Sequence, residues 1–343
     1  MSLFKKKTKF LGFDLSKTSV KIVELDQGGG KPTLVTYGGL EFPPFNLESA
    51  SNKAKEEVIR TINEVIKRSR ASTHDIITSL PPQNVFSAVL SVPKVTDREL
   101  QEAVKWEAKQ YIPAPLEEVI IDWQKIGQDE ETKKIEIYLV AAPKLLVKKY
   151  LELYQQANLN PLALEIDPLA LARSLVGTEI EPLILVDIGA YETSISLVEK
   201  GVLRFSRTIT SGGETITKAI ASNLNIEEQR AEQFKKDFGV QAEKLEGEIL
   251  KSIQPIINTL ITEIKRSIEF YKTEGKEKIK KIILSGGGAH LPELTTYLTK
   301  NLNIEAKVGN PWININYPQD LTPHLNEVGP SFAVAIGLAM RRL

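Results

Sequence analysis

Residues 183–198 read Leu183-Ile-Leu-Val-Asp187-Ile-Gly189-Ala-Tyr-Glu-Thr-Ser-Ile-Ser-Leu-Val198. Two apolar runs flank a short polar turn, a pattern that is typical of a β-hairpin. The carboxylate of Asp187 closes the first run, so it is expected at the tip of the hairpin. This stretch therefore predicts a hairpin that presents an acid halfway along the chain.

The same plan occurs near the N-terminus. An apolar run from Phe10 ends in Asp14, and a turn-like segment at 16–19 leads into a second apolar run at 20–25. The two acids lie about half the chain apart. A repeated supersecondary unit at this spacing predicts a duplicated domain, with two similar lobes that face each other across a cleft.

Composition limits the class of protein. The chain has 343 residues and 42% hydrophobic content, enough to bury the cores of two lobes. Lys plus Arg and Asp plus Glu both number 44, so no net positive charge favours a nucleic-acid partner. Cys is absent, which excludes disulfides and thiolate sites and favours a cytoplasmic protein. No run approaches the roughly 20 apolar residues of a membrane span.

Periodicity predicts the remaining elements. Apolar residues at helical spacing from Ile249 to Tyr271 indicate a long amphipathic helix, bent at Pro255. Trp106, Trp123 and Trp312 are expected to be packing anchors. The other predictions are helices at 58–69, 98–112, 144–157, 292–302 and 331–340, and strands at 84–93, 135–142, 162–166 and 281–284.

The two hairpin turns suggest a phosphate site. Tight turns of small residues expose several backbone N–H groups, which bind the oxygens of a triphosphate. The carboxylates of Asp14 and Asp187 would repel phosphate directly, but they suit a hydrated Mg²⁺ held through water. The alternative is that each Asp only caps its own turn.

Glycines mark two further positions. Gly286, Gly287 and Gly288 follow a predicted strand, where absent side chains let a flat ring or a phosphate approach the backbone. The alternative is a merely flexible loop. Gly212 and Gly213 precede a predicted helix whose N-terminal N–H groups could receive an anion. No Walker loop is present, because no Gly-Lys-Ser or Gly-Lys-Thr follows the glycines.

Taken in order, these features resemble the actin-like ATPase superfamily, and within it the PilM family of type IV pilus assembly proteins. The resemblance is carried by 104–113, 164–168, 185–189, 268–271, 284–288, 310–312 and 328–338. It implies an α/β protein with the actin-like ATPase fold: two RNase H-like lobes around a nucleotide cleft, with a small subdomain inserted in the first lobe.

The resemblance also implies domain boundaries. The first lobe would span 1–180, with its core at 1–80 and 155–180 and an inserted partner-binding subdomain at about 81–154. The second lobe would span 181–343, with its core at 181–215 and 279–325 and a helical subdomain at about 216–278. A closing C-terminal helix at 330–343 would pack back on the first lobe.

The resemblance assigns roles to single residues around ATP and Mg²⁺. The first phosphate loop would contain Asp14, Ser16, Lys17 and Thr18, and the second Asp187, Gly189, Ala190, Tyr191 and Glu192. Gly286, Gly287 and Gly288 would form the adenosine-side turn, and Glu232 and Lys235 would lie against the ribose and adenine. Asp14 and Asp187 would hold the metal through water, and Asp167 would orient the attacking water.

Three of these residues have a further interpretation. Glu232 and Lys235 also fit an ordinary exposed ion pair on a helix. Relatives usually have Gly at the position of Ser16, so its side chain is expected to narrow the approach to the phosphates and weaken nucleotide binding or hydrolysis.

The function implied by the resemblance is an ATP-binding scaffold with at most weak ATPase activity. It would be cytoplasmic and peripheral to the inner membrane, bind the N-terminal tail of the inner-membrane protein PilN through the subdomain around Glu99 to Pro115, and connect indirectly to PilO and the pilus platform that supports twitching motility. A homo-oligomer is left open.

Two alternatives share the fold. An FtsA-like cell-division protein is disfavoured, because the chain stops at Leu343 without the C-terminal linker and amphipathic helix usual in FtsA. A small-molecule kinase would need a substrate-facing base, and no candidate is identified.

Overall fold

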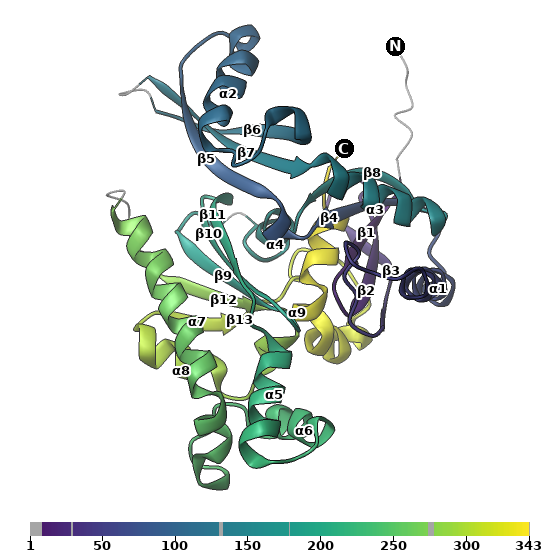
Figure 1. Cartoon of the computed structure of the whole chain (residues 1–343), viewed down its shortest axis with the longest axis vertical. Helices are drawn as coiled ribbons and strands as arrows, with labels where there is room; N and C mark the ends of the chain where they lie inside the picture. Colours follow the sequence, from purple (N-terminus) through teal and green to yellow (C-terminus); the bar gives the residue numbers. More distant parts are fainter. Residues whose placement is uncertain (1–8, 29, 130–132, 178, 274–277, 343) are drawn as a thin grey trace.

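Two five-stranded sheets of the same topology form the centres of two lobes (Figure 1). The computed structural model describes residues 9–28, 30–129, 133–177, 179–273 and 278–342. The strand orders are β3-β2-β1-β4-β8 and β11-β10-β9-β12-β13, each with three antiparallel strands followed by two parallel ones. The duplicated fold predicted from the two Asp hairpins is therefore confirmed.

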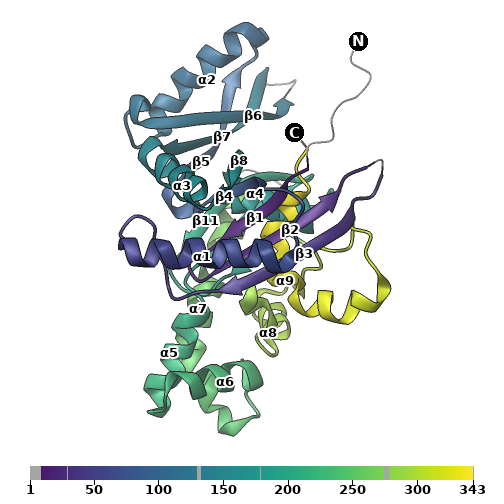
Figure 2. The same cartoon turned by 90° about the vertical axis from the view of Figure 1, so that its right-hand side faces the viewer.

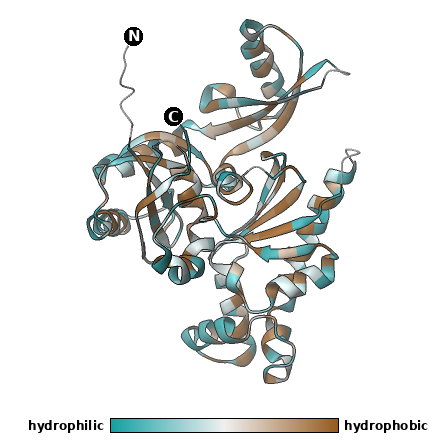
Figure 3. Cartoon of the chain, turned by 180° about the vertical axis from the view of Figure 1, so that it is seen from behind, coloured by the Kyte–Doolittle hydropathy of each residue, from teal (hydrophilic) through white to brown (hydrophobic). Residues whose placement is uncertain are grey.

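The inner strands of both sheets are buried along nearly their whole length, because both of their faces are covered. Figure 3 shows the second-lobe strands as largely hydrophobic. The first sheet consists of β1 (Leu11–Leu15), β2 (Ser19–Asp26), β3 (Thr33–Glu41), β4 (Asp75–Leu80) and β8 (Asn160–Ile166). The second consists of β9 (Leu183–Ile188), β10 (Thr193–Glu199), β11 (Val202–Ile209), β12 (Lys281–Ser285) and β13 (Glu305–Val308).

Helices cover the faces of both sheets. The first lobe carries α1 (Asn52–Ser69), α3 (Lys144–Gln156) and α4 (Asp167–Leu175). The second carries α5 (Gly213–Leu224), α6 (Glu228–Phe238), α7 (Glu248–Thr273) and α8 (Leu294–Leu302). Short 3₁₀ segments are η1 (Pro82–Asn84), η2 (Leu116–Glu118), η3 (Leu245–Gly247), η4 (Gly287–His290) and η5 (Gln319–Leu321).

The last helix, α9 (Thr322–Ala339), starts earlier than predicted and runs through Pro330. A proline inside a helix removes one backbone hydrogen bond, so the sequence favoured a start after it. Here the Pro330 carbonyl accepts from the N–H of Gly286 at 2.9 Å and from Ser285 Oγ at 3.0 Å. Helix α9 also packs on α4 and β1, so the C-terminal helix joins the first lobe while touching the second.

Helix α7 confirms the long amphipathic helix expected in the second lobe. It continues through Pro255 and buries a stripe that includes Ile249, Ile253 and Ile264. This stripe packs against the second sheet in a core of its own. Among the described residues, no helix has the length and apolar character required to cross a membrane.

A small subdomain projects from the first lobe between β4 and α3 (Figure 2). It contains β5 (Phe86–Pro93), α2 (Asp97–Tyr111), β6 (Val119–Asp129) and β7 (Lys134–Pro143), with strand order β5-β7-β6. It has a separate hydrophobic core, and β5 lies against β11 of the second lobe. The inserted subdomain therefore contacts both lobes.

Helix α2 packs one face on the inserted subdomain's sheet. A capping box between Thr96 and Glu99 fixes its start, and Leu100, Val104 and Ala108 are buried. Trp106 lies on the opposite face and is 72% exposed, so its predicted role as a packing anchor is wrong. The same role is confirmed for Trp312, which is fully buried.

Candidate functional site

A cavity of about 350 Å³ lies between the two lobes. Parallel pairing of β1, β4 and β8 brings the carboxyl ends of these strands to one edge of the first sheet, and β9 contributes the facing end. Of the predicted site residues, those that line this cavity are Ser16, Lys17, Thr18, Asp167, Asp187, Gly189, Ala190, Tyr191 and Glu192.

Two acids at the base of the cavity have raised pKa values. Burial, together with the nearby charge of Asp14, raises the pKa of Asp167 well above its ordinary value. Burial likewise raises the pKa of Asp187 to about 6, with Asp14 again contributing. Like charges kept from water repel, so this part of the cavity favours a positively charged ligand.

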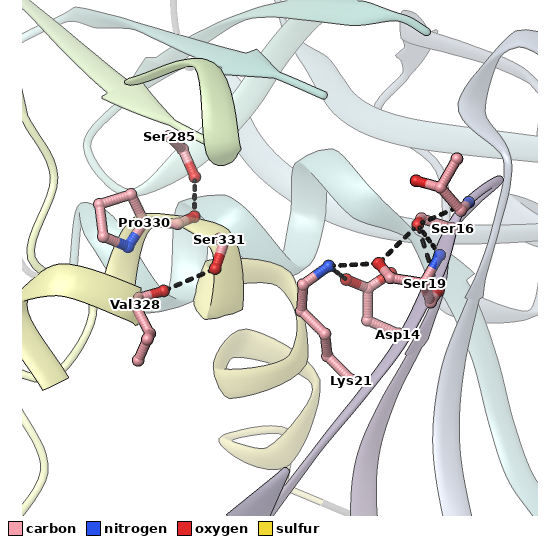
Figure 4. A network of polar contacts seen from close by, with 9 residues as sticks. Asp14, Ser16, Ser19, Lys21, Ser285, Val328, Pro330 and Ser331 are labelled. Atoms are coloured by element: carbon pink, nitrogen blue, oxygen red, sulfur yellow. Dashed lines mark hydrogen bonds and ion pairs between the residues drawn. The ribbon is translucent and has the colours of Figure 1, made fainter. Parts of the chain in front are cut away.

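Asp14 lies beneath the first loop and is only 8% exposed. It stands opposite Lys21 in the β1–β2 hairpin, with Lys21 Nζ 4.0 Å from Asp14 Oδ2 and 2.7 Å from Ser19 Oγ (Figure 4). Burial still raises the pKa of Asp14 despite this lysine. Sequence analysis missed Lys21, although a lysine within the apolar strand after the turn is an available signal.

The acid arrangement fits a hydrated divalent cation. Within the described ranges, no three His, Cys, Asp or Glu side chains are placed to coordinate a metal together. Mg²⁺ usually keeps several waters and needs only one or two carboxylates alongside phosphate oxygens. Asp14 and Asp187 could therefore reach such a metal only through water, and their role as metal holders stays a prediction.

The first loop is closed by the side chain of Ser16. Its Oγ accepts from the N–H groups of Ser19 at 3.1 Å and Thr18 at 3.4 Å, and it lies 3.2 Å from the Ser19 carbonyl. A glycine at this position would leave those N–H groups without this acceptor. The hydroxyl thus competes with any phosphate for two donors of the loop.

The second loop keeps its donors open. The N–H of Gly189 donates to the Glu192 carbonyl at 2.9 Å, which fixes the turn. In the described part of the chain, the N–H groups of residues 190–192 donate to no protein acceptor. Residues 190–192 line the cavity, so their N–H groups are available to a phosphate there.

The N-terminus of α5 does not offer the donors that the sequence predicted. The N–H of Gly213 donates to the Gly189 carbonyl at 2.9 Å, and that of Glu214 donates to the Ala190 carbonyl at 2.8 Å. A Cβ on Gly212 would lie 2.4 Å from the Gly189 oxygen. The two glycines therefore bring α5 against the second loop, and the carbonyls of this loop occupy the sites expected for an anion.

The predicted adenosine-side glycines do not line the cavity. Gly286 and Gly288 lie against the end of β9, whose Asp187 does line it. Gly286 has φ +77°, and a Cβ there would lie 2.4 Å from the Ile188 oxygen, so β12 can approach the end of β9 only with glycine. Gly287 faces open space. Gly288 lines a second, small apolar cavity of about 20 Å³, together with Gly212.

Glu232 and Lys235 of α6 form an ion pair that is hydrogen-bonded to α5. Lys235 Nζ lies 2.5 Å from Glu232 Oε2 and donates to the Gly213 carbonyl at 3.2 Å, while Thr217 Oγ1 donates to Glu232 at 2.6 Å. Hydrogen bonds from Lys235 and Thr217 hold the pKa of Glu232 below its ordinary value despite burial. The structure thus brings the pair together away from the cavity.

A polar contact joins the two loops at the cavity. Lys17 Nζ donates to Glu192 Oε1, and Gln83 Nε2 donates to the same oxygen at 3.1 Å. Sequence analysis missed Gln83 because it missed β4, whose end positions residues 79–84 at the cavity. The signal available was the short apolar run at 75–80 that stops at two prolines.

Comparison with known proteins agrees with this fold. A solved PilM-PilN type IV pilus biogenesis complex contains a chain that is 29% identical, with a TM-score of 0.84 over 98% of this chain and 99% of that one. MreB5 of Spiroplasma citri bound to ADP shares the fold, with 12% identity and a TM-score of 0.53 over 96% and 95% of the two chains.

Sequence relatives point the same way. Cell division protein FtsA of Bacillus subtilis is 24% identical, and the match covers 91% of this chain and 81% of FtsA. The profile of the family described as "Type IV pilus assembly protein PilM" matches residues 12–343. The chain therefore belongs to the PilM family of type IV pilus assembly proteins, which have the actin-like ATPase fold.

Proposed function

We propose that the cavity binds ATP with Mg²⁺ and that the protein is a nucleotide-binding scaffold of pilus assembly. The observation that carries this proposal is the convergence, from both lobes, of two acids, Asp167 and Asp187, and three open backbone N–H groups on one cavity of about 350 Å³, with Asp14 buried beneath the first loop. A ligand with both phosphate oxygens and a divalent cation satisfies both sets of groups at once.

Each part of the cavity then has a chemical task. The N–H groups of residues 190–192 would bind phosphate oxygens, and Lys21 would add positive charge beneath the first loop. Asp14 and Asp187 would accept hydrogen bonds from the waters of the metal. Bound Mg²⁺ would neutralise phosphate charge.

Hydrolysis is expected to be slow, because Ser16 Oγ competes with phosphate for two N–H donors of the first loop. Asp167, at the start of α4, is the acid that would orient the attacking water. Retained nucleotide suits a scaffold, because a bound ligand stabilises one arrangement of the lobes.

The proposed partner is the cytoplasmic N-terminal tail of PilN. Support comes from the solved PilM-PilN type IV pilus biogenesis complex, whose matching chain aligns over almost all of this one. The proposal places the tail on the inserted subdomain, where Trp106 of α2 offers a large exposed side chain. PilN would hold the protein at the inner membrane and link it indirectly to PilO.

Replacing Trp106 with Ala is expected to weaken binding of a synthetic PilN tail by about tenfold or more, as is typical for a buried aromatic anchor at an interface. The matched control is Ile313→Ala, since Ile313 is 64% exposed but lies outside the inserted subdomain. Fluorescence anisotropy with a labelled tail measures both variants. Equal binding by W106A and the parent would contradict docking on α2.

An FtsA-like cytoskeletal role in cell division is the second candidate, and it rests on the 24% identity to cell division protein FtsA. Sedimentation of the pure protein with Mg-ATP, without any pilus partner, separates the two. Pelleted polymer would favour the FtsA-like role, and a soluble nucleotide-bound protein would favour the scaffold.

A further inference from the structure

The contact between the loops involves three side chains from three separate elements. Lys17 comes from the first loop, Gln83 from η1, and Glu192 from the second loop. All three line the cavity, and both donors converge on the same oxygen of Glu192. The Glu192 side chain is 19% exposed and that of Lys17 is 40% exposed, so the pair is only partly screened by water.

This contact has the donors of an anion-binding site, and the anion that they bind is the carboxylate of Glu192. An ammonium group and a side-chain amide are the donors that bind a carboxylate or a phosphate oxygen. The carboxylate of Glu192 satisfies them in the absence of ligand. A phosphate that entered between the loops would meet occupied donors and a facing negative charge.

We propose that Glu192 is an internal competitor for phosphate. It holds Lys17 and Gln83 when no nucleotide is bound, and a phosphate of the incoming nucleotide takes over these two donors. This inference rests on the proposed nucleotide function and adds a residue that sets the affinity. The exchange exposes the Glu192 carboxylate to solvent and breaks the direct link between the loops.

The competitor also connects the cavity to the inserted subdomain. Gln83 belongs to η1, which leads into β5, the first strand of that subdomain, and η1 contacts β11 of the second lobe. Release of Gln83 from Glu192 removes a hydrogen bond between η1 and the second loop. Nucleotide binding then changes the restraint on the subdomain that we propose binds PilN.

Glu192→Gln is expected to tighten Mg-ATP binding by about fivefold, because the competing ion pair loses its charge. Glu214→Gln is the matched control: it removes one negative charge close to Tyr191, in the same loop, but Glu214 contacts neither Lys17 nor Gln83. Calorimetric titration with Mg-ATP, and with inorganic tripolyphosphate as a probe without a base, measures both variants. E214Q should change either affinity by less than about twofold.

A double variant tests whether the gain in affinity comes from the release of Lys17. In Lys17→Gln protein, Glu192→Gln should bring much less gain, because the main donor held by the carboxylate is already lost. Without any ligand, hydrogen–deuterium exchange of residues 79–84 should be faster in E192Q than in E214Q. Exchange that is equal in both would overturn the restraint assigned to Glu192.

The outcomes separate the competitor from the nucleotide function. Binding of Mg-ATP with equal affinity by the parent and E192Q, or equal tightening by E214Q, overturns the competitor and leaves the proposed function intact. Binding by neither parent nor E192Q overturns both. Tighter binding by E192Q alone, reduced in the Lys17→Gln background, supports the competitor.

Discussion

Asp187→Asn is expected to weaken magnesium-dependent nucleotide binding by about 10- to 100-fold, the usual cost of removing an outer-shell partner of a metal. The asparagine keeps the shape of the side chain but cannot attract the waters of a cation as a carboxylate does. The measurement is a calorimetric titration with Mg-ATP at pH 7.5. Binding as tight as that of the parent would show that Asp187 plays no part in holding the metal.

The same substitution should stabilise the protein without ligand. Folding raises the pKa of Asp187 from 3.8 to about 6, mainly through burial, so the charged form disfavours the folded state at neutral pH. The stability from this group is fully present below pH 3.8 and is lost as the pH rises through about 6. Thermal unfolding at pH 5 and 7.5 should therefore show a smaller pH dependence in D187N than in the parent.

A control variant tests whether the loss of nucleotide binding is specific to Asp187. Asp237→Asn alters an exposed aspartate of α6 that does not line the cavity, so nucleotide binding should not change. A melting temperature at pH 7.5 that is lower in D187N than in the parent would contradict the claim that the buried charge of Asp187 destabilises the folded state.

Gly337→Ala is expected to produce the largest loss of stability. Gly337 lies in α9 against α4, and a Cβ there would fall 1.9 Å from the backbone oxygen of Ala170. Backbone cannot yield as a flexible side chain can, so α9 must shift at a cost of about 3 kcal/mol or more. Arg173 and Ser174 of α4 also donate to carbonyls of α9, which a shift would break.

Urea unfolding followed by circular dichroism measures this cost. Gly287→Ala is the matched control, because a Cβ at Gly287 meets nothing within 4 Å. A midpoint for G337A equal to that of G287A would show that α9 does not pack closely on α4 in solution. A lower midpoint for G337A alone would support the close helix pair.

The duplicated fold was predictable because its signal is local. Each hairpin has two apolar runs, one turn and one acid, and tertiary packing is not needed to recognise the pattern. Helix α7 was predictable for the same reason, since its apolar stripe repeats over many turns. Local patterns also located the two loops that line the cavity.

What escaped prediction depends on contacts that are distant in the sequence. Helix α9 runs through Pro330, whose carbonyl accepts from the turn after β12, and local sequence does not reveal this contact. Trp106 looked like an anchor in composition alone, and only the orientation of α2 reveals its exposure. The N–H groups of α5 looked free until the carbonyls of the second loop were seen to accept from them.

The central claim is that the cavity binds nucleotide through a magnesium ion. The most direct test is calorimetric titration of the unsubstituted protein with ATP, once in Mg²⁺ and once in EDTA. We predict saturable binding of one ATP with Mg²⁺ and at least about tenfold weaker binding without it. ATP binding of equal strength in EDTA, or none at millimolar Mg-ATP, would contradict the account.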